Sequence, residues 1–403
     1  MHNRKQRQFQ LERLAPVYFL RYDSLCQTIG TASCRTAMSP HREYVLSMNI
    51  TTNYVKYISA MKTWALLIFS IATSVAYPCY GATQDARLLE LGRLLFQETS
   101  LSADAKTSCA SCHDVAHAYA DPHARSIGAN SKAGTRNAPS LVGIGDDRSF
   151  AWDGRRDKLE DAVLDPFTNP VELGLGSTTE LLQKLKTSAH IREAFDNAFP
   201  NDSNSVTLTH AGDALARFVR SLRSDASPFD EAKHNHHALA PAAENGRRLF
   251  EGAAGCSRCH ESASETPRLT DNLYHHSSIG EATQSPRLPA LARAVVAENL
   301  EASRIGPKVL TDAEWSSLGR FVVSHQPGDI GAFRTPSLRN VAVTAPYMHD
   351  GSIATLEKAV DHEIYYHGLS TGHPVNLTQP DREALVEFLT TLTDTPADAP
   401  AHH

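Results

Sequence analysis

One pattern occurs twice in this chain and limits how it can fold. The string G-R-x-L-F begins at Gly92 and again at Gly246, and a C-x-x-C-H motif follows it each time. Each half also ends in a stretch whose apolar residues have the i, i+3, i+4, i+7 spacing of one helix face. The matching residues are Ala214, Leu215, Phe218, Val219 and Leu222 in the first half, and Ala384, Leu385, Phe388, Leu389 and Leu392 in the second. The repeat predicts two similar halves, each with an opening and a closing helix.

The chemistry of the chain is set by the two C-x-x-C-H motifs. Their residues are Cys109, Cys112 and His113 in the first motif, and Cys256, Cys259 and His260 in the second. Two thiols three positions apart can each add to one vinyl group of a haem, and the following His presents its imidazole to the iron. A zinc site needs four ligands, a redox-active C-x-x-C expects a βαβ context, and a disulfide at this spacing is strained. The motifs therefore predict two covalently bound haem c groups.

The start of the chain has the features of a processed leader. From Met61 a short basic region, an apolar stretch and the small residues Gly81 and Ala82 form a pattern typical of a secretory signal peptide. We expect residues 61–82 to be this signal, residues 1–60 to be an upstream mis-start, and the mature protein to be periplasmic. An uncleaved anchor helix is the alternative. Cys26, Cys34 and Cys79 then fall outside the mature chain, which keeps the four cysteines of the two motifs.

The fold expected for the rest is mainly α and loop-rich. Two tandem cytochrome c-like domains, each with one covalently bound c-type haem, are expected at residues 83–233 and 243–396, with a linker at Asp225–Ala242. Residues 126–170 and 280–376 have no long periodic segments and are expected to be ordered loops, apart from a helical-looking insertion near 284–315. The net charge of −6 and the lack of a dense basic cluster argue against a nucleic-acid partner.

Several longer stretches extend these motifs in a fixed order between about Leu88 and Asp394. They are LGRLLFQETSLSADAKTSCASCH, GTRNAPSL, WDGRRDKLEDAVLDPFTNPVELG, DASPFDEA, RRLFEGAAGCSRCH and GAFRTPSLRNVAVTAPYMHDGSIATLE. This ordered set strongly resembles the bacterial di-haem cytochrome c peroxidase and MauG family. The resemblance implies that the haem of His113 is the peroxidatic one, and that the haem of His260 transfers electrons to it.

The resemblance also implies roles for three further residues. Glu172, in the sequence PVE, matches the acidic catalytic residue, which moves a proton between the two oxygens of peroxide. Trp152 matches the aromatic residue between the haems, where it can shorten an electron hop. Asn137 matches a residue that helps to hold Ca²⁺ between the domains, together with backbone carbonyls near Thr344 and Pro346.

The chain departs from the family pattern on the peroxide side. Relatives that need reductive activation carry a removable iron-ligating His after the SIG motif, but Ala129 stands there, and alanine cannot ligate iron. We therefore expect the haem of His113 to be five-coordinate when oxidised, unless His117 or His123 compensates. Ala162 replaces a glutamine found in many relatives, so hydrogen bonding to peroxide is expected to differ.

The sixth ligand of the second iron is ambiguous. The family places Met or Tyr shortly after the HDG motif, and this chain has HEIYYHG there. Counting forward from Leu356 reaches Glu363, whereas counting back from Gly368 reaches Tyr365. We expect Tyr365 to be the ligand, with Tyr366, Glu363 and Met348 as alternatives.

Three functions remain open from the sequence. The first is a peroxidase that takes electrons from a small cytochrome c or a cupredoxin and reduces hydrogen peroxide. The second is a MauG-like oxidase that modifies Trp or Tyr side chains of a protein partner. The third, a pure electron carrier, is disfavoured by Glu172 and by the missing His. A homodimer is compatible with the resemblance.

Overall fold

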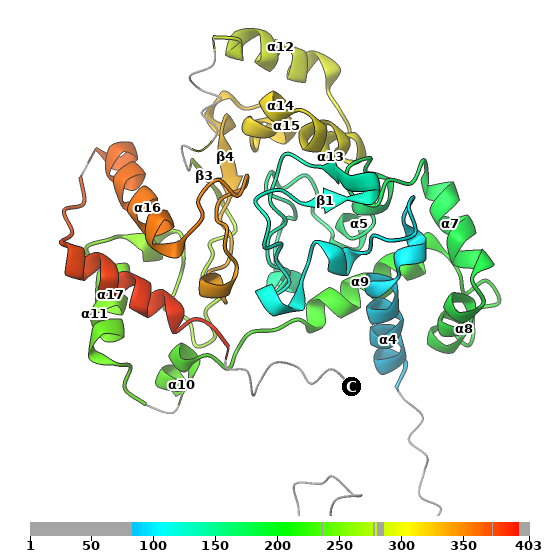
Figure 1. Ribbon diagram of the computed structural model, residues 1–403, viewed down its shortest axis with the longest axis horizontal. Helices are drawn as coiled ribbons and strands as arrows, with labels where there is room; N and C mark the ends of the chain where they lie inside the picture. Colours follow the sequence, from blue (N-terminus) through cyan, green and yellow to red (C-terminus); the bar gives the residue numbers. More distant parts are fainter. Residues whose placement is uncertain (1–82, 235–236, 277–278, 280–285, 373, 395–403) are drawn as a thin grey trace, which may run out of the picture. The chain divides into compact units, whose positions relative to one another are not determined.

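The structure of the protein is a computed structural model that describes residues 83–234, 237–276, 279, 286–372 and 374–394. The expected signal peptide and the extension before it lie outside these residues. All described residues fall within one compact unit, Cys79–His403, in which helices are joined by long loops (Figure 1). None of the described helices combines the length and the apolar character needed to cross a lipid bilayer.

The first half is organised by the crossing of two long helices, α4 (Gln84–Gln97) and α9 (Leu208–Ser221). Gly92 lies at the crossing, where a Cβ atom would overlap the carbonyl oxygen of Ala214, so only glycine allows this approach. Four shorter helices complete this half: α5 (Leu159–Ala162), α6 (Asp165–Thr168), α7 (Thr178–Thr187) and α8 (Ala189–Ala198). Strands β1 (Ile127–Gly128) and β2 (Lys132–Ala133) form a small antiparallel hairpin.

The second half repeats this crossing with α11 (Pro241–Glu251) and α17 (Gln379–Thr390). Gly246 takes the place of Gly92, because a Cβ atom there would overlap the carbonyl oxygen of Ala384. Each crossing has its own hydrophobic core, with Phe96 and Phe218 in the first and Phe250 and Phe388 in the second. The predicted opening and closing helices are therefore confirmed, and the repeated glycine is their point of contact.

The segment expected to be a linker is partly a helix that belongs to the second core. Helix α10 (Pro228–His234) places the Phe229 ring 5.5 Å from that of Phe388. The buried carboxylate of Asp230 accepts hydrogen bonds from both terminal nitrogens of Arg339, at 2.5 and 2.9 Å. Because Phe229 and Asp230 are both buried, this part of 225–242 is fixed structure and not an open connection.

The second expected loop region is also more ordered than its composition suggested. The insertion near 284–315, which was expected to look helical, contains α12 (Leu288–Glu298), α13 (Ala302–Thr311) and the start of α14 (Ala313–Ser317). Two further helices, α15 (Phe321–Ser324) and α16 (Leu356–Thr371), lie where loops were expected. Strands β3 (Tyr274–His276) and β4 (Ala332–Arg334) pair antiparallel beside them. Helices α12 to α15 share a small core around Val309 and Trp315. These helices are stabilised by tertiary packing, which the weak apolar periodicity of their sequence did not predict.

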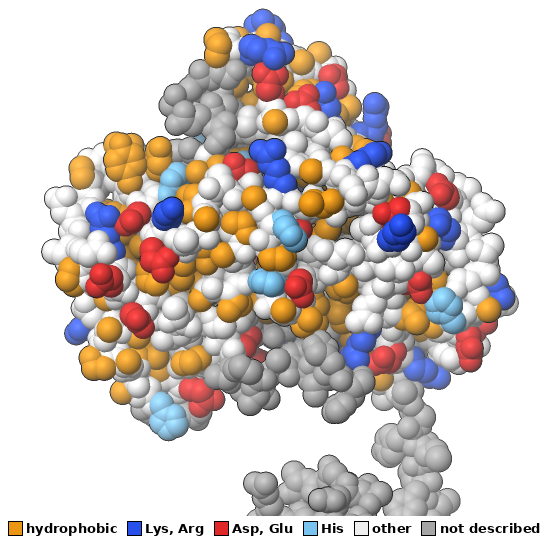
Figure 2. Space-filling model, viewed as in Figure 1, with side chains coloured by type: hydrophobic (Ala, Val, Ile, Leu, Met, Phe, Trp, Pro, Cys, Tyr) orange, Lys and Arg blue, Asp and Glu red, His pale blue; other side chains and the backbone are white. Residues whose placement is uncertain are grey.

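The inserted helices rest on the first half. The Thr135 backbone N–H donates to the Leu310 carbonyl at 3.1 Å, and its hydroxyl donates to the Val309 carbonyl at 2.6 Å. Val171, the neighbour of Glu172, packs against the same small core. The insertion thus supports the backbone that carries Glu172. On the outside, acidic and basic side chains are interspersed over the face seen in Figure 2.

Candidate functional site: two haem-attachment turns

The first C-x-x-C-H motif forms a tight turn that fixes His113. The turn begins as a short 3-10 helix, Cys109–Ser111, and the His113 N–H donates to the Cys109 carbonyl at 3.0 Å. The His113 Nδ1 lies 2.9 Å from the carbonyl oxygen of Tyr119, a residue with φ of 58°. A carbonyl bound at one ring nitrogen orients the imidazole, which is the usual arrangement of a metal-ligating His.

The second motif repeats this geometry. The 3-10 helix is Cys256–Arg258, and the His260 N–H donates to the Cys256 carbonyl at 3.0 Å. The His260 Nδ1 lies 2.9 Å from the carbonyl oxygen of Leu269, whose φ is 55°. Both imidazoles are therefore oriented by a carbonyl from a residue in the left-handed region. Burial lowers the pKa of His113 and of His260, which favours the neutral form that binds iron.

The four cysteines suit thioether formation. None of them is paired in a disulfide in the described structure. Burial raises the pKa of Cys109, Cys112 and Cys256 to about 12, and that of Cys259 to about 11, because a thiolate would be poorly solvated there. A thioether carries no charge and avoids this cost. The residues present therefore fit two covalently bound haems.

A cavity next to the second turn has room for such a group. It is lined by His260, Cys256 and Cys259 on the attachment turn, by Phe250 and Leu385 of the crossing helices, and by one side of α16. The lining is largely apolar, as a haem face requires. Trp152 and Asn137 of the first half border the same cavity.

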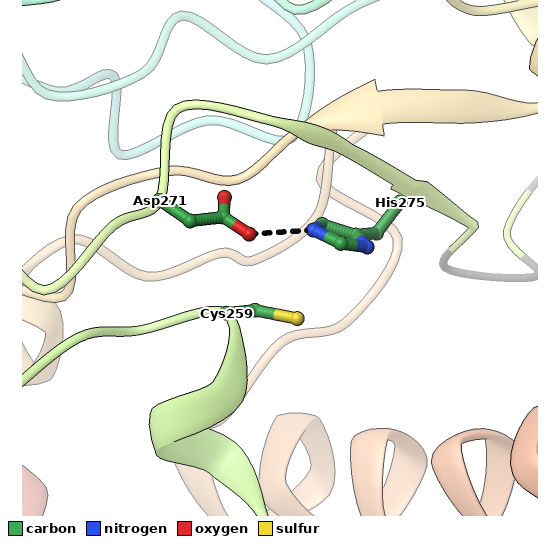
Figure 3. Close-up of side chains that lie close together, drawn as sticks. All are labelled: Cys259, Asp271 and His275. Carbon is green, nitrogen blue, oxygen red and sulfur yellow. Dashed lines mark hydrogen bonds and ion pairs between the residues drawn. The ribbon is translucent and has the colours of Figure 1, made fainter.

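A cluster of metal-binding side chains at this turn has another explanation. Cys259, Asp271 and His275 bring one ligand atom each within 4.8 Å of one another, and the Asp271 carboxylate lies 2.7 Å from the His275 Nε2 (Figure 3). Cys259 is the second thiol of the C-x-x-C-H motif, so its sulfur is needed for the haem bond. The remaining Asp271–His275 pair is exposed at the imidazole and is too small a set to hold a metal ion.

Glu172 faces the first attachment turn. Its charge acts on Cys109 and Cys112, and burial raises its own pKa to about 7, with Asp165 adding to the shift and Arg155 opposing it. The Glu172 carbonyl accepts a 2.6 Å hydrogen bond from the Ala129 N–H. A Cβ atom on the adjacent Gly128 would overlap the Glu172 carbonyl, so glycine permits this close approach.

Arg155 is a site residue to which the sequence assigned no role. Its guanidinium bonds both oxygens of the buried Asp153 at 3.1 and 3.2 Å and lies 4.0 Å from Asp165. It is the largest opposite charge acting on Glu172, and it is held against Gly306 of the inserted helix α13. The two adjacent arginines of the WDGRR stretch could have indicated a charged site, but the sequence does not show which groups their side chains contact.

Trp152 is fixed by hydrogen bonds to both halves. Its Nε1–H donates to the Asn137 carbonyl at 2.9 Å, and its own carbonyl accepts from the Arg334 N–H at 2.9 Å. The Asn137 side-chain amide donates to the carbonyls of Asp121 and His123, which leaves its side-chain oxygen available to a cation. Asn137, Thr344 and Pro346 are among the residues that line the same cavity.

Each candidate substitute for the missing His is paired with a carboxylate through its Nδ1. The His117 Nδ1 lies 3.0 Å from Asp114, and the His123 Nδ1 lies 2.8 Å from Asp121. Their side chains are 38% and 68% exposed. Ala129 is only 1% exposed, beside the backbone of Glu172, and Ala162 ends helix α5.

Helix α16 separates the candidates for the sixth ligand of the second iron. Tyr365, which we expected, is 62% exposed and does not border the cavity, because it lies on the helix face opposite to Leu356. Tyr366 does not border it either, whereas Glu363 and Met348 do. From the sequence alone, counting forward from Leu356 to Glu363 and counting back from Gly368 to Tyr365 were equally plausible. The helical register of α16 distinguishes the two residues.

Comparisons with known proteins agree with this geometry. A model of the family described as di-haem cytochrome c peroxidase matches residues 86–238. The cytochrome-c peroxidase IdrP2 of Denitromonas iodatirespirans is 31% identical over 323 residues, covering 79% of this chain and 84% of that protein. The methylamine utilization protein MauG of Methylorubrum extorquens is 31% identical, covering 76% and 78%.

Solved structures show the same relationship. A crystal structure of a MauG-like protein associated with microbial copper homeostasis superposes with a TM-score of 0.63 at 28% identity, covering 76% of this chain and 89% of that one. The di-haem peroxidase BthA from Burkholderia thailandensis shares the fold, with a TM-score of 0.57 at 22% identity over 76% of this chain and 86% of that one. The chain therefore belongs to the di-haem cytochrome c peroxidase and MauG family of oxidoreductases.

Proposed function

We propose that the protein reduces hydrogen peroxide to water at the haem of His113, with electrons that enter through the haem of His260. The balance is one peroxide, two electrons and two protons to two waters. When bound, the haem supplies the iron that passes electrons into the O–O bond. The observation that carries the proposal is Glu172, a carboxyl at the first attachment turn with a pKa of about 7.

Glu172 performs the proton transfer that this reaction needs. A carboxyl with a pKa near the working pH takes a proton from one peroxide oxygen and returns it to the other with little loss in either step. Arg155 and Asp165 set the charge around it. Ala129 offers no iron ligand at the position where reductively activated relatives carry a His, so the oxidised protein would bind peroxide without prior reduction.

The electrons come from a small redox protein. We propose a cytochrome c or a cupredoxin in the periplasm, reached through the expected signal peptide, with Trp152 between the two haem sites. Asn137, Thr344 and Pro346 hold Ca²⁺ in this proposal. A homodimer is compatible with it.

Steady-state turnover of peroxide with reduced cytochrome c tests the proposal. We expect turnover, and we expect the fully oxidised protein to show one high-spin haem per chain before any reduction. An oxidised spectrum with only low-spin haem would contradict the open site at Ala129. N-terminal sequencing of the exported protein tests the leader: a mature chain that retains residues before Met61 would contradict it.

A second function is favoured by a specific observation. MauG of Methylorubrum extorquens is as similar to this chain as the peroxidase IdrP2 is, at 31% identity. We propose as the alternative that the protein uses peroxide to oxidise Trp or Tyr side chains of a protein partner. Negligible turnover with reduced cytochromes and cupredoxins, together with peroxide-dependent modification of a partner protein, would select this alternative.

A further inference from the structure

Helix α16 presents one carboxyl to the cavity of the second haem. The residues of α16 that line this cavity are Leu356, Ala359, Val360, Glu363 and Ile364. Their i, i+3, i+4, i+7, i+8 spacing is a single helix face, and four of the five are aliphatic. Glu363 is the one carboxyl among these five residues.

Glu363 has no protein partner that would explain its position. No hydrogen bond or ion pair joins its carboxyl to any other residue in the described part of the chain, and burial raises its pKa to about 7. Its charge acts on Cys256 and Cys259, so it faces the attachment turn. Another acid of the same helix, Asp361, differs in its partner: both carboxyls are accessible, but that of Asp361 accepts a 2.7 Å hydrogen bond from Arg382.

Two other donor side chains of the cavity, those of Tyr347 and His275, are engaged in hydrogen bonds. The Tyr347 hydroxyl donates to the Val341 carbonyl at 2.9 Å, and burial raises its pKa to about 12, so it stays a neutral phenol. His275 is paired with Asp271. The His349 ring also lines the cavity and stacks on Phe333 at 3.7 Å, and its buried Nδ1 has no hydrogen-bond partner in the described part of the chain. His349 is therefore the competing donor that the test must separate from Glu363.

We propose that the Glu363 carboxylate is the sixth ligand of the iron held by His260. A hard, anionic oxygen ligand favours ferric over ferrous iron, so this haem would have a lower reduction potential than one with a thioether ligand. The proposal rests on haem attachment at Cys256, Cys259 and His260, and not on which substrate is oxidised. It gives the second site an anionic oxygen ligand without a tyrosine.

The test compares Glu363→Gln and Glu363→Ala with Glu357→Gln, an exposed residue of the same helix. Haem content is measured first, and two haems per chain are expected in every variant. The ferric absorption and electron paramagnetic resonance spectra of one haem should change in both Glu363 variants, while those of the other haem stay as in the wild type. The reduction potential of the altered haem should rise. Glu357→Gln should change neither spectrum nor potential.

Two outcomes overturn the assignment. Unchanged spectra and potentials in both Glu363 variants would remove Glu363 as a ligand, and a change seen instead in Met348→Leu or in His349→Ala would name its replacement. If Glu363→Gln fails to take up haem, Glu363→Ala provides the same readout. A wild-type chain with fewer than two haems would contradict the proposed function itself, which haem content distinguishes from a failed ligand assignment.

Discussion

The two halves of this protein hold the imidazole of the C-x-x-C-H motif in the same way, but they differ in the surroundings of the carboxyl near each motif. In both, a glycine-mediated helix crossing leads into the attachment turn, and a carbonyl of a left-handed residue fixes the imidazole at 2.9 Å. The carboxyls opposite are unlike: Glu172 lies among charged residues, whereas Glu363 lies on an aliphatic helix face. The two halves therefore share the turn that would attach a haem, and they differ in the residues around the nearby carboxyl.

The largest effect is expected when the carboxyl of the first site, Glu172, is removed, because only this carboxyl is proposed to transfer protons. Glu172→Gln keeps the size of the side chain and removes proton transfer, so we expect kcat for peroxide to fall roughly 100- to 10,000-fold. Steady-state kinetics with a reduced cytochrome measures it. Glu193→Gln, an exposed residue of α8, is the matched control and should retain wild-type kinetics. A loss under threefold in Glu172→Gln would show that the two carboxyls do not differ as proposed.

The acidity of Glu172 should be visible in the pH profile. Burial raises its pKa to about 7, and the group must be deprotonated to accept the peroxide proton. We therefore expect kcat/KM to increase with pH up to about 7 and to level off above it, falling about tenfold per pH unit on the acid side. The acid limb should disappear in Glu172→Gln. An unchanged limb in that variant would assign it to another group.

The similarity of the halves can be tested at the helix crossings. Gly92→Ala and Gly246→Ala each place a Cβ against a carbonyl of the crossing helix, so we expect each to lower the free energy of unfolding by about 1–3 kcal/mol. Thermal or denaturant unfolding measures both. Gly328→Ala, where no atom lies within 4 Å of the added Cβ, should change stability little. A large effect at only one crossing would mean that the two cores are not equivalent.

The smallest expected effect on stability concerns the contact between the halves. Trp152→Phe keeps an aromatic ring but loses the hydrogen bond to Asn137, which should cost about 1 kcal/mol. Reduction of the first haem by electrons entering at the second should become slower, as measured by stopped-flow absorption. Trp315→Phe, in the core of the inserted helices, serves as the control and should leave this rate unchanged. Equal rates in all three proteins would remove Trp152 from the electron path.

The sequence was sufficient for features that depend on local periodicity. The G-R-x-L-F repeat and the i, i+3, i+4, i+7 pattern predicted the opening and closing helices of both halves, and the C-x-x-C-H spacing predicted both turns. Features that depend on register or on distant contacts were not accessible. Tyr365 and Glu363 differ by two positions, which on α16 turns the side chain from cavity to solvent. The role of Arg155 depends on Asp165 and on the inserted Gly306, which no local pattern connects to it.

The bonds around Trp152 have a mechanical consequence. The Trp152 indole N–H donates to the Asn137 carbonyl, and the Asn137 N–H donates to the His349 carbonyl. The Trp152 carbonyl accepts from the Arg334 N–H, so hydrogen bonds hold this residue from both halves. Rotation of one half against the other would break several of these bonds at once. If electrons pass between the two haem sites as proposed, these bonds would hold the spacing between donor and acceptor constant during turnover.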